Sequence, residues 1–170
     1  MRGLFFCLKL GGMSEHTHIT VTWNRLNEDC RALALALLEQ NLINTELKGF
    51  IALARGGLSV AQLLGNYLNI RRIESITVIS YDLDNPTVKL DESKLAGRPS
   101  PDIGDGTGWI VVDDLVDTGG SYRFVKQMLP NATFVALYAK PKGKPDAALT
   151  LTTFPQESWL DFPWEQKPII

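Results

Sequence analysis

Several residue types that common functional classes require are scarce in this 170-residue sequence. The two cysteines, Cys7 and Cys30, form no CxxC pair, and the two histidines, His16 and His18, lie together near the N-terminus. This scarcity argues against a disulfide scaffold and against a zinc site of the His/Cys type. We expect Cys30, which lies in an apolar helical pattern, to pack in the core, and the histidines to lie on the surface. A reducing compartment fits this use of cysteine.

An excess of one charge and long apolar runs are also absent. The formal net charge is −2, so no general attraction to nucleic acid is expected. No apolar stretch approaches the about 20 residues of a membrane-spanning helix. Residues 1–10 have a short apolar core broken by Lys9 and no A-x-A-like cleavage site, which argues against a signal peptide. We expect residues 1–12 to be a non-native extension or a mistaken start, and residues 13–170 to form a single domain.

Three nucleotide and catalytic motifs are missing as well. The chain has no GxxxxGK[ST], which excludes a Walker-type phosphate loop, and no GxGxxG dinucleotide fingerprint. It also has no GxSxG, which excludes a nucleophile elbow.

What is present is an alternation of strand-like and helix-like patterns. Apolar, β-branched runs occur at 19–22, 50–54, 73–80, 109–112 and 134–139. Helical periodicity predicts helices from Thr22, as N-cap, to about residue 40, over 58–68, and over 121–129 before Pro130. This order predicts an α/β domain with a mainly parallel sheet covered on both faces, and ligands beyond the carboxyl ends of the strands. We expect residues 81–108 to form a long flexible lid loop and residues 140–170 to wrap over the domain as a tail.

The most informative segment is residues 110–121, Ile-Val-Val-Asp-Asp-Leu-Val-Asp-Thr-Gly-Gly-Ser. A buried strand pattern ends in the adjacent carboxylates of Asp113 and Asp114, and Asp117 follows. Carboxylates at a strand end suit a divalent cation or sugar hydroxyls. The small turn 118–121 before a helical pattern suits a phosphate. Together these features point to a phosphorylated sugar.

This segment resembles the phosphoribosyl-diphosphate-binding signature of type I phosphoribosyltransferases. The sequence Arg55-Gly56-Gly57 looks like the family's diphosphate-binding loop, which carries a non-proline cis peptide, and Lys140 looks like its purine-selecting lysine. The segment 159–164, Trp-Leu-Asp-Phe-Pro-Trp, looks like its base-stacking, hood-like tail. With these segments and Val21-Thr22-Trp23 near the start, the chain resembles the short bacterial xanthine-guanine phosphoribosyltransferases over roughly residues 13 to 166.

The resemblance implies a type I phosphoribosyltransferase fold and a reaction in which N9 of a purine replaces diphosphate on ribose 5-phosphate. Guanine and xanthine are the expected bases, with hypoxanthine weaker. Residues implied to bind phosphoribosyl diphosphate are Arg55, Gly56, Asp113, Asp114, Leu115, Val116, Asp117, Thr118, Gly119, Gly120 and Ser121. Residues implied to bind the purine are Asp117, Lys140, Trp159 and Leu160.

Each of these roles has a physical reason. Asp113 would accept hydrogen bonds from the ribose hydroxyls, and Asp114 would face Mg²⁺, which offsets the charge of the leaving diphosphate. Asp117 would be the general base that accepts the N7 proton. Lys140 donates hydrogen bonds and accepts none, so it favours an oxygen at purine C6 over the amino group of adenine. Trp159 would stack on the base, and Leu160 would contact its edge through the backbone.

Some alternatives stay open at this stage. A non-catalytic regulator that senses phosphoribosyl diphosphate could keep the same site, and an enzyme for another base could share the signature. Lys89 could replace a basic lid residue that the family usually has after Tyr-Asp-x-Asp-Asn, and Glu165 could be a second metal-side acid. The resemblance also implies a homodimer or homotetramer in the cytoplasm, with peripheral association with the inner membrane.

Overall fold

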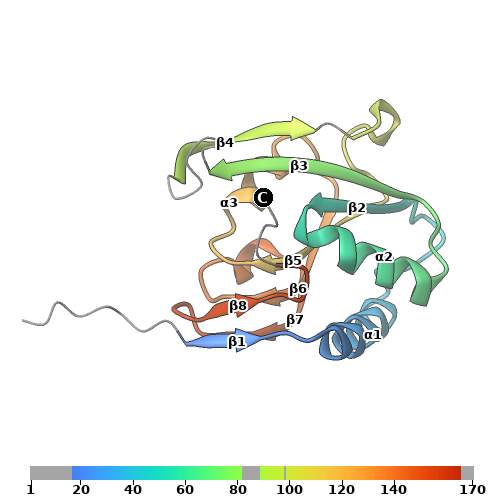
Figure 1. Cartoon of the computed structure of the whole chain (residues 1–170). Coiled ribbons are helices and arrows are strands. Elements are labelled where there is room, and N and C mark those ends of the chain that lie inside the picture. Colours follow the sequence, from blue (N-terminus) through green and yellow to red (C-terminus); the bar gives the residue numbers. More distant parts are fainter. Residues whose placement is uncertain (1–16, 82–88, 98, 166–170) are drawn as a thin grey trace, which may run out of the picture.

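The computed structural model describes residues 17–81, 89–97 and 99–165 of the chain. Its centre is a six-stranded sheet with strand order β4-β3-β2-β5-β6-β7 (Figure 1). Four of the five strand pairs are parallel, and only β3 and β4 are antiparallel. The strands are β2 (Gly49–Ala54), β3 (Ile73–Tyr81), β4 (Lys89–Gly97), β5 (Trp109–Val116), β6 (Thr133–Ala139) and β7 (Leu149–Thr153). The predicted α/β class with a mainly parallel sheet is therefore confirmed.

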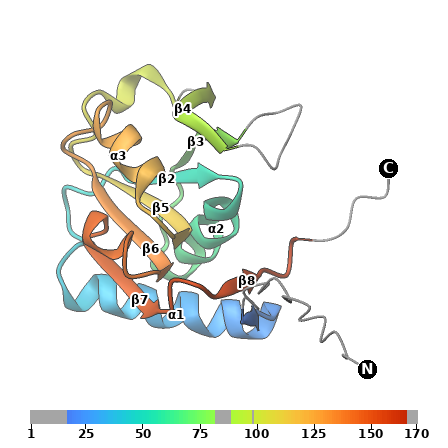
Figure 2. The same ribbon diagram turned by 90° about the vertical axis from the view of Figure 1, so that its left-hand side faces the viewer.

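Helices cover both faces of this sheet, as Figures 1 and 2 show. Helices α1 (Trp23–Glu39) and α2 (Gly56–Leu68) pack on one face, and α3 (Gly120–Lys126) packs on the other. Alternate residues of β2 serve the two sides: Phe50 and Ala52 join the core under α1 and α2, whereas Ile51 joins the core under α3. This period of two, without polar interruption, is typical of a strand buried on both faces.

The first helix forms as its sequence predicts. The side chain of Thr22 accepts a hydrogen bond from the Arg25 N–H at 3.2 Å, which caps the helix N-terminus. The apolar positions at helical spacing, Leu26, Cys30, Leu33 and Leu37, are all buried. Burial of Cys30 confirms its expected packing role, and the neighbouring Asp29 adds to the effect of burial, so that the pKa of the Cys30 thiol rises to about 12.

The prediction of a lid loop over residues 81–108 is wrong for residues 89–97 and for the short helix after them. Residues 89–97 form β4, which pairs with β3, and a short 3₁₀ helix, η1 (Pro101–Ile103), follows. Ile103 is buried against the α3 side of the sheet. The sequence of β4, Lys-Leu-Asp-Glu-Ser-Lys-Leu-Ala-Gly, has no β-branched residue, so local pattern gave no strand signal. Residues 82–88 lie outside the described residues, and the lid over them stays a prediction.

Residues 140–165 also contain more regular structure than the predicted tail. After a 3₁₀ turn, η2 (Lys144–Asp146), strand β7 extends the central sheet. Strand β8 (Trp159–Asp161) then pairs in parallel with β1 (His18–Thr20), so the segment near the start of the described chain holds the segment near its end. His18 is exposed, as expected, and its Nδ1 lies 2.9 Å from Asp161 Oδ2. Residues 1–16, including Cys7 and His16, lie outside the described residues.

Candidate active site

The acidic pair lies where β5 runs on beyond its neighbour β2. Pairing between these strands ends at Ala52 and Val112, whereas β5 stays paired with β6 as far as Val116. Strand β2 turns away into α2 through a cis peptide bond between Ala54 and Arg55, as expected for the loop. Asp113 and Asp114 therefore stand at the carboxyl end of the parallel sheet, beside the start of α2.

Two glycines allow α2 to begin this close to β5. A Cβ atom built on Gly56 would overlap the carboxyl group of Asp114, and one built on Gly57 would overlap the carbonyl oxygen of Val112. The loop that starts at Arg55 and the carboxylate of Asp114 are thus in direct proximity. Glycine at position 56 is required by this approach rather than by a positive φ angle.

The electrostatics of the pair favour a cation. Burial, followed by the charge of Asp114, raises the pKa of Asp113 well above its usual range. Burial also raises the pKa of Asp114, against the lowering effects of hydrogen bonds from the Asp113 carboxyl group and from the Leu115 N–H, the latter at 2.7 Å. In the described part of the chain neither carboxylate has an ion-pair partner. A divalent cation would favour the charged forms, so the donor set fits Mg²⁺.

Glu165 approaches the carboxylate of Asp114 from the far end of the described chain. Its charge is close enough to contribute to the raised pKa of Asp114, and its Oε2 accepts a hydrogen bond from the Phe162 N–H at 3.1 Å. Within the described residues, however, no group of three His, Cys, Asp or Glu side chains could hold a metal ion by itself. This composition is typical of Mg²⁺ sites that take one or two carboxylates and complete the shell with phosphates and water.

The turn 118–121 presents backbone at the adjacent position. Gly119 has φ +78°, and α3 begins at Gly120. The helix is only seven residues long and ends at Lys126, earlier than predicted. Gln127 and Met128 form a turn between the helix and Pro130. The backbone N–H groups of the turn 118–121, more than a helix dipole, are what this segment offers to an anion.

An ion pair that the sequence did not reveal supports this turn. Arg123 donates to the Thr118 carbonyl oxygen at 3.0 Å and pairs with Asp146, which belongs to η2. The Asp146 carbonyl in turn accepts from Lys126 at 2.7 Å. A side chain at Gly119 would collide with both members of the pair, so the turn and η2 fit closely.

Asp117 and Lys140 are brought together as an ion pair. The Lys140 Nζ lies 3.0 Å from Asp117 Oδ2, and Lys140 is only 6 % exposed. The second carboxylate oxygen, Oδ1, accepts a hydrogen bond from the Gln156 Nε2 at 2.7 Å. Sequence reasoning missed Gln156, since a single glutamine between strands carries no motif.

Trp159 and Leu160 occupy β8, three and four residues beyond Gln156. Trp159 is 54 % exposed, so it is not core packing, whereas Leu160 is buried. The Trp159 N–H donates to the Thr17 carbonyl at 2.9 Å, which fixes the strand against β1. Trp164 instead stacks on Phe162, with ring centroids 4.8 Å apart, and packs against the main core.

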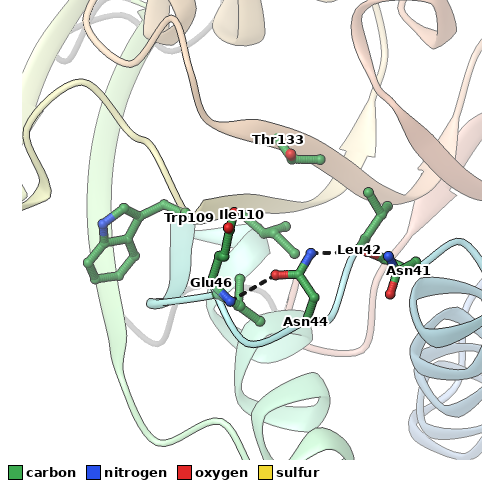
Figure 3. Close-up of a pocket in the computed structure, with 9 residues that line it drawn as sticks. Asn41, Leu42, Asn44, Glu46, Trp109, Ile110 and Thr133 are labelled. Atoms are coloured by element: carbon green, nitrogen blue, oxygen red, sulfur yellow. Dashed lines mark hydrogen bonds between the residues drawn. The ribbon is translucent and has the colours of Figure 1, made fainter.

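A small pocket at the opposite edge of the sheet is separate from these residues. Figure 3 shows Asn41, Asn44 and Glu46 beside Trp109 and Thr133, the first residues of β5 and β6. Its volume is about 120 Å³, and hydrogen bonds within the loop, such as that from the Glu46 N–H to Asn44 Oδ1 at 3.0 Å, engage both ends of the Asn44 side-chain amide. It lies at the amino ends of the strands, whereas ligands of parallel α/β sheets bind at the carboxyl ends.

Fold and site together define an α/β protein whose parallel strands bring carboxylates and a glycine-rich turn together at their carboxyl ends. Residues 22–164 match the phosphoribosyl transferase domain family. The chain therefore belongs to the phosphoribosyltransferase family. None of the helices in the described ranges has the length and apolar character needed to cross a membrane.

Individual relatives agree with this assignment. The chain is 41 % identical over 152 residues to a xanthine-guanine phosphoribosyltransferase of Gluconobacter oxydans, covering 89 % of this chain and 87 % of the relative. It is 40 % identical to one of Chromohalobacter salexigens, covering 88 % and 85 %. Among solved structures, a purine phosphoribosyltransferase from Pyrococcus horikoshii superposes with a TM-score of 0.71 at 25 % identity, covering 90 % and 97 %.

Proposed function

We propose that this enzyme transfers 5-phosphoribose from phosphoribosyl diphosphate to N9 of guanine or xanthine, and less well of hypoxanthine. The products are the nucleoside monophosphate and diphosphate. The observation that carries the proposal is the buried Lys140 that pairs with Asp117, directly after β5. A buried cation that only donates, paired with a carboxylate that only accepts, complements the C6 oxygen and the N7–H of a 6-oxopurine. The names of the relatives at 41 % and 40 % identity support guanine and xanthine as substrates.

The phosphoribosyl donor is proposed to lie along the edge formed by the end of β5 and two loops. Arg55 and the Gly56 backbone hold the diphosphate, the backbone N–H groups of the turn 118–121 bind the 5-phosphate, and Asp113 accepts from the ribose hydroxyls. Arg123 is exposed and already bound to the Thr118 carbonyl, so its part is to keep the turn in shape. The donors for the phosphates and the acceptor for the ribose all lie at the carboxyl ends of the strands, where ligands of parallel α/β sheets bind.

Mg²⁺ is the proposed metal, with Asp114 as its protein-side ligand, directly or through water. When bound, it offsets the charge of the diphosphate leaving group. Asp114 would orient it beside the loop at Gly56, since carboxylate and loop are adjacent. Glu165 is close enough to add a second negative charge on this side.

The purine is proposed to stack on the exposed Trp159 with its C6 oxygen toward Lys140. In the structure the Lys140 ammonium group donates to Asp117 Oδ2. When the base enters, the ammonium group donates to the C6 oxygen, and the freed Oδ2 of Asp117 accepts the N7 proton as N9 attacks C1. The Leu160 backbone contacts the edge of the base.

The test is direct detection of products. The purified chain is incubated with phosphoribosyl diphosphate, Mg²⁺ and guanine, and nucleotide and diphosphate are measured by mass spectrometry and a diphosphate assay. Equal amounts of GMP and diphosphate are expected, and XMP is expected with xanthine. Binding of phosphoribosyl diphosphate without turnover of any base would instead favour the sensor alternative. Assembly as a homodimer or homotetramer, a cytoplasmic location and peripheral membrane association remain predictions from the family resemblance.

A further inference from the structure

Gln156 is held at both ends of its side-chain amide. Its Nε2 donates to Asp117 Oδ1 at 2.7 Å, and its Oε1 accepts from the Lys142 backbone N–H at 3.0 Å. The second contact fixes which end of the amide faces the carboxylate. If the amide were flipped, its oxygen would face the Asp117 carboxylate and its NH₂ group would face an N–H donor, so both contacts would become repulsive. Gln156 is thus oriented as a donor to Asp117.

The two oxygens of Asp117 therefore have different partners. Oδ2 is bound by the side chain of Lys140, which the proposed function requires to turn toward the C6 oxygen when a base is present. Oδ1 is bound by a neutral amide whose other end is tied to the backbone. When a purine binds, Asp117 loses its contact with Lys140 and keeps its contact with Gln156. The Asp117 side chain is 48 % exposed, so without Gln156 its carboxylate would be free to turn toward solvent once Lys140 is engaged.

We propose that Gln156 is a positioning residue that holds Asp117 Oδ1, so that Oδ2 meets the purine N7–H. The inference rests on the proposed function, because it presupposes that Asp117 accepts this proton. It links the loop after β7 to the chemistry at β5, across 39 residues of sequence. General-base catalysis requires the acceptor within hydrogen-bond reach of the proton, and Gln156 supplies the fixed orientation for that reach.

Two substitutions separate this role from a purely structural one. Gln156→Ala removes both hydrogen bonds. Gln156→Glu keeps an oxygen that accepts from the Lys142 N–H, so the tie to the backbone survives, but the ionised carboxylate cannot donate to Asp117 and repels it. The matched control is Gln62→Ala, since Gln62 is exposed on α2 and its side chain bonds Asn66, one turn further along the same helix, at 3.4 Å.

The measurements are kcat with guanine, the Kd of phosphoribosyl diphosphate, and inhibition constants of two analogues. 9-Deazaguanine carries an N7–H and a carbon at position 9, whereas 7-deazaguanine has no N7–H for Asp117 to accept. With Gln156→Ala we expect kcat to fall about tenfold, a part of the roughly 10²–10⁴-fold contribution of a positioned base. The inhibition constant of 9-deazaguanine should rise about tenfold, because the hydrogen bond from its N7–H to the Asp117 carboxylate loses its orientation. The inhibition constant of 7-deazaguanine should change less than about twofold. Gln156→Glu should be at least as impaired.

Other outcomes overturn the inference. If Gln156→Glu retains wild-type kcat while Gln156→Ala does not, Gln156 only ties the loop to Lys142. Equal changes for the two deazaguanines would also exclude a role through the N7–H. Wild-type kcat in both variants would remove Gln156 from the reaction while leaving the proposed function standing. Absence of turnover in the wild-type enzyme would instead defeat the proposed function itself. If Gln156→Ala does not fold, the comparison of Gln156→Glu with the wild type, on kcat and on both analogues, decides.

Discussion

Replacing Gly56 by alanine should separate catalysis from stability at the start of α2. The three atoms nearest to an added Cβ all belong to the Asp114 carboxyl group, and all lie well inside 3.0 Å, a limit that real Cβ atoms essentially never cross. Relief of the overlap requires the carboxylate or the loop to move by about 1 Å, and a misplacement of that size costs about 10²-fold in rate. We therefore expect kcat/KM for phosphoribosyl diphosphate to fall about 100-fold, which corresponds to about 2.7 kcal/mol.

Stability should change much less, because the group displaced is the end of a side chain and Gly56 has no positive φ angle. Alanine also favours the helix over glycine by up to about 1 kcal/mol, which offsets part of the overlap. We expect Tm to shift by less than about 4 °C. Gly57→Ala is the contrasting variant, since its Cβ would meet the backbone oxygen of Val112, which cannot rotate away, and it should lower Tm clearly.

The assay is steady-state kinetics at several Mg²⁺ concentrations, beside thermal unfolding of the same samples. Gly56→Ala should need more Mg²⁺ for half-maximal rate, because Asp114 is the group displaced. The exposed Gln62→Ala variant on the same helix serves as control. Wild-type kcat/KM and Mg²⁺ dependence in a folded Gly56→Ala protein would refute the reasoning that Asp114 and this loop act together.

Three further predictions concern the purine side and the core. Asp117→Asn should lower kcat by about 10²–10⁴-fold with little change in the Kd of phosphoribosyl diphosphate, as measured by calorimetry, and unchanged kcat would exclude a general base there. Lys140→Met should reduce kcat/KM for guanine at least tenfold and leave kcat/KM for adenine unchanged or slightly raised, because only the donor to a C6 oxygen is lost; an equal loss for both bases would point to a structural role. In a Cys7→Ser background, Cys30 should resist iodoacetamide at pH 8 until the protein unfolds, since burial and a pKa of about 12 keep it a thiol, and rapid labelling of the native protein would contradict its placement.

Local sequence signals account for much of this fold. The buried strands and the capped first helix follow from apolar periodicity and from Thr22. The segment 110–121 places two acids in the last part of one strand, and a third acid and a glycine turn directly after it. These features depend on residues that are close in sequence, which is the range over which apolar periodicity is informative. The edge strand β4 lacks that signal, because pairing to β3 rather than its own composition makes it a strand. Strand β7, Leu-Thr-Leu-Thr-Thr, does alternate apolar and β-branched polar residues, and the prediction of an irregular tail overlooked this short pattern.

The parts of the site that sequence did not reveal depend on contacts between distant segments. Arg123 meets Asp146 across 23 residues, and Gln156 meets Asp117 across 39. Neither pair forms a motif, and each becomes visible only when the loops after β5, β6 and β7 are brought to one edge by the parallel sheet. Side chains that complete a site in this way are set by topology.

The central claim is that a 6-oxopurine is the acceptor, selected by the buried Lys140 beside Asp117. The measurement that tests it most directly is the ratio of kcat/KM for guanine to that for adenine in the wild-type enzyme, with Mg²⁺ and phosphoribosyl diphosphate at saturation. A site whose buried donor has no partner on adenine predicts a ratio of about 10⁴ or more. A ratio near one, or a preference for adenine, would contradict the account.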